Sequence, residues 1–207
     1  MAANSASGAF ILYLHGFTGG PQSLKARALG AHMARRGLSE RFICPQLPAS
    51  PAAAIALTEN LLAAKLGTGE TAPRHDDDVT IVGSSLGGYY ATWLAEKYGA
   101  RAVLVNPAVA AHISLEKYLG PQRWLYSGEE FELTRQHLAE MRALYLPVLK
   151  HPERFWLLAE EGDETLDYRQ AVARYAGARQ TVLTGGNHSF TRWSDYLDDI
   201  LAFASMA

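Results

Sequence analysis

The chain has 207 residues, which is the size of a single domain with a substantial buried core. Its 19 lysines and arginines nearly balance its 21 aspartates and glutamates, and no basic run could follow a nucleic-acid backbone. No apolar stretch approaches the roughly 20 residues of a membrane-spanning helix. The single cysteine excludes an internal disulfide, as is usual in a reducing compartment such as the cytoplasm. These features predict one globular domain, residues 1–207, that binds no nucleic acid and has no membrane span.

Short apolar runs recur along the chain, and each predicts a parallel strand, because buried parallel strands are continuously apolar. They cover residues 9–14, 41–44, 79–83, 102–106, 155–159 and 180–184. Segments of helical length and spacing cover residues 22–36, 51–66, 86–98, 166–175 and 191–203. Helix-ending glycines follow several of them, at Gly37, Gly67, Gly99 and Gly177. The alternation predicts an open, mostly parallel six-stranded sheet with helices on both faces, whose ligands bind at the carboxyl ends of the strands.

Three segments depart from this alternation. Residues 1–8 have no apolar core and no basic side chain, so they predict a flexible tail and not a secretory signal. Residues 67–78 end in three aspartates that no histidine or glutamate accompanies at the spacing of metal ligands, which favours a solvated turn over a metal site. Residues 109–152 are longer than a crossover requires.

The long segment of residues 109–152 is rich in aromatic side chains and contains a helical pattern near residues 133–145. The aromatic residues are Tyr118, Trp124, Tyr126, Phe131 and Tyr145. Its position predicts a helical lid over the ligand-binding edge of the sheet, with the rings forming an apolar substrate site. The alternative to a lid is a long connection between two strands, in which the aromatic rings only form part of the hydrophobic core.

The segment TIVGSSLGGYY contains a G-x-S-x-G motif, formed by Gly83, Ser85 and Gly87, between a predicted strand and a predicted helix. The serine of such a motif sits on a sharp, strained turn, where side chains in place of the glycines would crowd the strand and the helix. We therefore predict that Ser85 is a nucleophile. Taken alone, the motif is also compatible with a glycine-rich turn that has no chemistry.

A serine nucleophile needs a histidine base and an acid that orients it. Among seven histidines, His188 follows the last predicted strand, on a loop at the sheet edge where Ser85 lies. Asp163 follows the strand of residues 155–159 and starts from the same edge, whereas Asp167 falls at the next predicted helix. The predicted triad is therefore Ser85, Asp163 and His188, in the chain order of the α/β-hydrolases.

The tetrahedral intermediate of acyl transfer also needs hydrogen-bond donors for its oxyanion. We expect one from the backbone N–H of Leu86 and the other from that of Phe17, in the loop after the first strand. In that loop Gly16 permits close approach and His15 braces the turn. The sequence HGFTGG lacks the G-x-G-x-x-G pattern of dinucleotide binding.

Several segments together resemble the YqiA-like esterase family of the α/β-hydrolase superfamily, over about residues 10–203. They are LYLHGFTGGPQSLKA, CPQLP, VGSSLGGYYATWLAEKYG, AVLVNPAV, GDETLDYRQAVARYAGARQTV and GGNHSF. The resemblance implies a compact α/β-hydrolase, ester hydrolysis in the bacterial cytoplasm, and a triad at Ser85, Asp163 and His188. The N-terminal tail and the linker of residues 67–78 depart from the family pattern, but neither touches the predicted site.

The prediction is a serine carboxylic-ester hydrolase that acts through an acyl-enzyme on small or acyl-chain esters, without metal or organic cofactor. A thioester such as an acyl-CoA needs the same machinery, so an acyl-CoA thioesterase is an alternative. A non-catalytic hydrolase-like module that binds a ligand or protein is another. The sequence predicts no oligomeric state.

Overall fold

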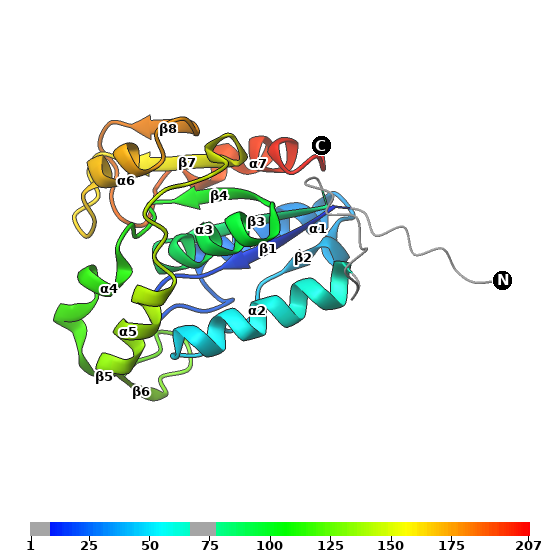
Figure 1. Cartoon of the computed structure of the whole chain (residues 1–207). Helices are drawn as coiled ribbons and strands as arrows, with labels where there is room; N and C mark the ends of the chain where they lie inside the picture. Colours follow the sequence, from blue (N-terminus) through cyan, green and yellow to red (C-terminus); the bar gives the residue numbers. More distant parts are fainter. Residues whose placement is uncertain (1–8, 67–77) are drawn as a thin grey trace.

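The computed structural model describes residues 9–66 and 78–207, which form a central sheet between two layers of helices (Figure 1). The predicted tail of residues 1–8 and most of the predicted solvated turn, residues 67–77 with the cap at Gly67, lie outside the described residues. In the part of the chain that is described, no helix is both long enough and apolar enough to cross a bilayer.

The predicted six-stranded parallel sheet is confirmed, with the strand order β2-β1-β3-β4-β7-β8. Its strands are β1 (Phe10–Leu14), β2 (Phe42–Ile43), β3 (Val79–Ser84), β4 (Arg101–Val105), β7 (Phe155–Glu160) and β8 (Arg179–Leu183). Every residue of β1, β3 and β7 is buried, which explains their mostly apolar sequences. The edge strand β2 is shorter than predicted, because a 3₁₀ turn at Ser39–Arg41 precedes it.

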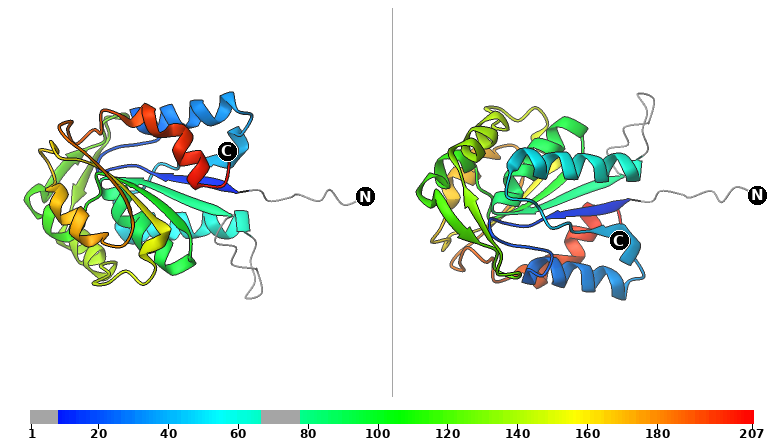
Figure 2. Two further views of the ribbon diagram at one scale, coloured as in Figure 1. Left: turned by 90° about the horizontal axis from the view of Figure 1, so that it is seen from above. Right: turned by 90° about the horizontal axis from the view of Figure 1, so that it is seen from below.

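Successive side chains of each strand point to opposite faces of the sheet, and each face is covered by its own helices. Helices α1 (Leu24–Arg35) and α7 (Leu197–Phe203) pack on one face. Helices α2 (Pro51–Leu66), α3 (Leu86–Tyr98) and α6 (Tyr168–Arg174) pack on the other. Figure 2 shows α1 and α7 on the side of the sheet opposite α2. The chain leaves β1 towards β2 and returns to β3 on the other side, so the strand order reverses between β1 and β3.

The predicted long insertion between β4 and β7 is mixed in structure and not purely helical. It contains α4 (Ala111–Ser114), a 3₁₀ turn at Glu116–Tyr118, the antiparallel hairpin of β5 (Gly120–Arg123) and β6 (Glu130–Leu133), and α5 (Arg135–Ala143). Helix α5 corresponds to the predicted helical pattern. The hairpin was not predicted, because β5 reads Gly-Pro-Gln-Arg and has no apolar residue to mark a strand.

Candidate active site

A strained turn between β3 and α3 carries Ser85, whose φ of 55° and ψ of −119° are unusual for a residue with a side chain. The glycines of the G-x-S-x-G motif make the turn possible. A Cβ on Gly83 would lie 2.3 Å from the carbonyl oxygen of Gly87, and one on Gly87 would lie 2.0 Å from that of Leu14. Only glycine fits at either position, so the local sequence forces Ser85 onto the end of the central strand.

The structure brings Ser85, His188 and Asp163 together from three loops that follow β3, β8 and β7. His188 Nε2 lies 3.0 Å from Ser85 Oγ, and His188 Nδ1 lies 2.8 Å from Asp163 Oδ2. The Asp163 side chain is only 2% exposed, and a carboxylate can only accept a hydrogen bond, so the geometry favours the His188 tautomer that carries its hydrogen on Nδ1. In that tautomer the Nε2 lone pair faces the serine hydroxyl.

The structure also distinguishes the two candidate acids. Asp163 Oδ1 accepts hydrogen bonds from the backbone N–H groups of Thr165 and Leu166, both at 2.8 Å, which hold the carboxylate towards His188. Asp167 instead caps α6, where its Oδ1 accepts the backbone N–H of Arg169 at 3.0 Å. Of the two, Asp163 alone is joined to the imidazole.

Two backbone N–H groups predicted to bind an oxyanion lie beside Ser85. Leu86 is the first residue of α3, and the first N–H groups of a helix have no intrahelical acceptor. The Phe17 N–H has no acceptor within the described part of the chain. A Cβ on Gly16 would lie 3.2 Å from Ser85 Cβ, so the loop after β1 runs directly against the serine.

His15 is buried under this loop, with 2% of its surface exposed. Its Nδ1–H donates to the Gly16 carbonyl at 2.9 Å, and its Nε2 accepts the Leu47 N–H at 3.0 Å. Burial lowers the pKa of His15, although the bond to Gly16 opposes that shift. A neutral His15 therefore ties the loop to the segment after β2.

Glu160, at the end of β7, holds the loop that carries His188, and the sequence analysis missed it. Its carboxylate is fully buried and accepts hydrogen bonds from the Asn187 N–H at 2.8 Å, the Thr191 N–H at 3.1 Å, and Thr191 Oγ1 and Arg192 Nε, both at 3.0 Å. Burial alone would raise the pKa of Glu160, but these bonds outweigh it and lower the pKa. The sequence feature that could have indicated this role is the position of Glu160, an acidic residue directly after the apolar residues of a buried strand.

Asn106, after β4, completes this support. Its Nδ2 donates to the carbonyl oxygens of Asn187 and His188, at 3.0 and 3.1 Å. Its Oδ1 accepts the Glu160 N–H at 3.0 Å. The residue has a φ of 41°, in the left-handed region that asparagine tolerates. The segment from Asn187 to His188 is thus bound to β4 and β7 through side chains that are themselves buried.

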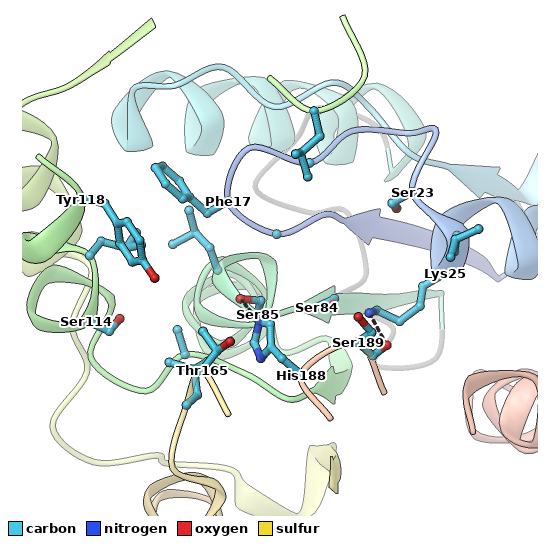
Figure 3. Close-up of a pocket in the computed structure, with 18 of the residues that line it drawn as sticks. Phe17, Ser23, Lys25, Ser84, Ser85, Ser114, Tyr118, Thr165, His188 and Ser189 are labelled. Atoms are coloured by element: carbon cyan, nitrogen blue, oxygen red, sulfur yellow. Dashed lines mark hydrogen bonds between the residues drawn. The ribbon is translucent and has the colours of Figure 1, made fainter. Parts of the chain in front are cut away.

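A cavity of about 390 Å³ opens over Ser85. Figure 3 shows Ser85 and His188 between Tyr118 and Ser114 on one side and Ser23 and Lys25 on the other. Within residues 9–66 and 78–207, no group of three or more histidine, cysteine, aspartate or glutamate side chains is arranged to hold a metal ion.

Comparison with known proteins places the chain in a family. The sequence model of the uncharacterised protein family UPF0227 matches residues 10–205. The chain belongs to this family. Its members include the YqiA-like proteins that the sequence resembles.

Solved structures of similar architecture establish the fold. A putative hydrolase from Agrobacterium vitis S4 superposes with a TM-score of 0.68 at 18% identity, covering 95% of this chain and 88% of that one. Est1E from Butyrivibrio proteoclasticus gives 0.65 at 13% identity, covering 99% and 91%. The esterase domain of a Rhodothermus marinus protein gives 0.62 at 18% identity, covering 95% and 86%. At these identities the likeness shows the fold alone, and this UPF0227 protein has the α/β-hydrolase fold, distantly similar to esterases.

Proposed function

We propose that the protein is a serine hydrolase of carboxylic esters. One observation carries the proposal: His188 Nε2 lies 3.0 Å from Ser85 Oγ while its Nδ1 lies 2.8 Å from the buried Asp163 carboxylate. This is the arrangement in which a serine hydroxyl loses its proton as it attacks a carbonyl. The strained turn at Ser85 and the donors at Phe17 and Leu86 support the same chemistry.

In the proposed reaction, Ser85 Oγ attacks the ester carbonyl carbon while its proton passes to His188 Nε2. Asp163 stabilises the imidazolium, and the N–H groups of Phe17 and Leu86 stabilise the oxyanion. The tetrahedral intermediate collapses when His188 returns the proton to the leaving alcohol oxygen, which forms an acyl-Ser85 enzyme. A water that gives its proton to His188 then hydrolyses the acyl-enzyme and regenerates the serine.

The insertion of residues 109–152 has two roles in this proposal. Trp124 and Phe131 pack against the loop after β1, with Phe131 and Phe17 ring centres 5.9 Å apart, so they brace the oxyanion donor. Tyr118 and Tyr126 line the cavity instead, where they would contact the substrate. The Tyr118 ring also packs against Phe17, with ring centres 6.1 Å apart, so in this proposal it serves both as support and as substrate contact.

A fluorophosphonate probe tests the proposal, because it reacts only with an activated serine. We expect the wild type to be labelled and Ser85→Ala to be unlabelled, and we expect turnover of p-nitrophenyl butyrate to fall by several orders of magnitude in that variant. Ser114→Ala is the matched control, because Ser114 lines the same cavity but bonds to Ala111 and not to His188. An inert wild-type protein would favour the non-catalytic binding module, and equal rates on matched esters and thioesters would extend the substrate class to thioesters.

A further inference from the structure

The cavity over Ser85 has a one-sided charge. Lys25 and Lys117 line it, whereas no aspartate or glutamate is among its described lining residues. Lys117 lies beside Tyr118, with its Nζ 5.1 Å from the ring centre. Lys25 lies at the opposite end, on α1 (Figure 3). A cavity lined in this way favours a negatively charged ligand over a neutral or positive one.

The end of the cavity near Lys25 is also formed by the N-terminus of α1. Ser23, Leu24 and Lys25 all line the cavity, and Ser23 is the N-cap residue. The Ser23 hydroxyl makes no capping bond, and the first turn of this 12-residue helix contains no acidic side chain. The free N–H groups and the positive end of the helix dipole are therefore uncompensated by side chains of the helix itself.

A second observation at the same end points to a ligand. The Tyr13 side chain is fully buried, and its hydroxyl makes no hydrogen bond of good geometry in the described part of the chain. The Ser23 and Ser84 hydroxyls lie near enough to oppose the rise that burial causes in the pKa of Tyr13. Ser23 Oγ likewise makes no hydrogen bond of good geometry, and both residues line the cavity. Buried hydroxyl groups without partners are rare in folded proteins, because each costs free energy until a partner is found. Two donors at one place are suited to the oxygens of one ligand.

Lys25 supplies the charge. Its Nζ donates one hydrogen bond, to the Ser189 carbonyl at 2.8 Å, so it has two further N–H groups. The nearby carboxylates of Glu160 and Asp163 are engaged by Arg192 and His188 respectively. Neither carboxylate lines the cavity, so neither competes there for the ammonium.

We propose that the end of the cavity formed by Tyr13, Ser23, Lys25 and the first turn of α1 binds a carboxylate carried by the substrate. The inference rests on the proposed function and narrows it, because the substrate becomes an ester whose acyl or alcohol part is anionic. A carboxylate fits better than a phosphate dianion, since the site has one ammonium.

The test compares esters that differ in charge alone. Mono-p-nitrophenyl glutarate and p-nitrophenyl pentanoate have acyl chains of equal length, and 4-acetoxybenzoate and its methyl ester place the charge on the alcohol side. We expect wild-type kcat/KM to favour the anionic ester of at least one pair by about tenfold, the effect of one charge-assisted hydrogen bond. The absence of a preference in both pairs would overturn the proposal.

Variants locate the site. Lys25→Met should bring the ratio of kcat/KM values for the preferred pair close to one, and Lys25→Arg should restore it. Tyr13→Phe and Ser23→Ala should each lower it several-fold. Lys117→Met is the comparison variant, because it removes the other lysine of the same cavity, and it should lower the ratio much less than Lys25→Met does. A ratio that survives Lys25→Met, or that is lost in Lys117→Met instead, would contradict the assignment.

A binding measurement tests this inference separately from the proposed function. Titration calorimetry of the Ser85→Ala variant with glutarate needs no turnover, and we expect binding that Lys25→Met abolishes. Should no ester be hydrolysed and no probe react, the proposed function fails while this measurement still tests the site. Inorganic phosphate is the competing probe, and tighter binding of phosphate than of glutarate would refute a carboxylate site.

Discussion

The loop that carries His188 and the insertion of residues 109–152 both flank Ser85, but different forces hold them. The loop is fixed by buried polar groups, since Glu160 and Asn106 bind its backbone at distances of 2.8 to 3.1 Å. The insertion makes hydrogen bonds such as that from the Leu125 N–H to the Thr18 carbonyl, but much of its contact beside Ser85 is aromatic. There Phe131 contacts Trp124 and Phe17 with ring centres 4.6 and 5.9 Å apart.

The difference corresponds to the task of each segment. Hydrogen bonds are directional, so a network of them fixes the position and angle of an imidazole within the narrow limits that proton transfer requires. Aromatic contacts are less directional and tolerate small shifts, which suits a surface that adapts to a substrate. Several residues of the insertion remain exposed, including Leu125 at 71% and Tyr126 at 48%. We therefore expect changes in the loop to alter kcat and changes in the insertion to alter KM.

The largest effect is expected at the acid that orients His188. Asp163→Asn should lower kcat by roughly 10³- to 10⁴-fold, because an amide in place of the carboxylate favours the wrong imidazole tautomer. Steady-state hydrolysis of p-nitrophenyl butyrate measures it. Asp167→Asn is the matched control and should retain turnover, since asparagine caps a helix as well as aspartate. A loss of turnover in Asp167→Asn with normal turnover in Asp163→Asn would reassign the acid.

A smaller effect is expected at Glu160. In Glu160→Gln an amide NH₂ must face either two backbone N–H donors or Arg192, so the loop shifts and kcat falls by about 10²-fold with little change in KM.

Acid unfolding gives an independent test of Glu160. Its lowered pKa stabilises the folded state above the ordinary carboxyl range, and this contribution is lost as pH falls through the lowered pKa. Urea unfolding at pH 7 and pH 4 should therefore show a smaller acid-dependent loss of stability in Glu160→Gln than in the wild type. Equal losses would show that Glu160 is not ionised in the way proposed.

The insertion should respond more weakly and in a different kinetic constant. Tyr126→Ala removes a ring that lines the cavity, so we expect kcat/KM for p-nitrophenyl esters to fall by about tenfold, chiefly through KM. Tyr145→Ala is the control, because Tyr145 belongs to the same insertion but packs against His112 and Arg174. A large fall in kcat with unchanged KM would show that the insertion positions the reacting groups and would remove the contrast with the loop.

The smallest expected effect is a change with pH in the preference for an anionic ester over a neutral one. Burial lowers the pKa of Lys25 to about 8, against the opposing influence of Glu160 and Asp163. The kcat/KM preference for mono-p-nitrophenyl glutarate over p-nitrophenyl pentanoate should therefore decline several-fold as pH rises through about 8, because Lys25 loses its charge. The ratio cancels the effects of pH on the reacting groups, because both esters use the same ones. In Lys25→Arg the preference should be flat, since arginine keeps its charge; a similar decline there would implicate another group.

The fold and the predicted reacting groups follow from local features of the sequence. Continuously apolar runs mark buried parallel strands, and the carboxyl ends of such strands share one edge, so residues that follow them must be neighbours. The glycines around Ser85 stand where no Cβ fits, which makes the strained turn readable from a short segment. For these reasons Ser85, Asp163 and His188 could be proposed as partners before their distances were known.

Only the tertiary structure distinguishes residues whose surroundings are built from distant segments. Glu160 and Glu161 are neighbours in sequence, yet Glu160 is fully buried among the donors of residues 187–192 and Glu161 is exposed. In the sequence, Tyr13 looks like one more apolar residue of a buried strand. Only the structure shows that its buried hydroxyl lacks a hydrogen bond of good geometry and that the residue lines the cavity with the start of α1. Periodicity reports which side of an element is buried, whereas the partner of a buried polar group depends on packing between segments far apart in the chain.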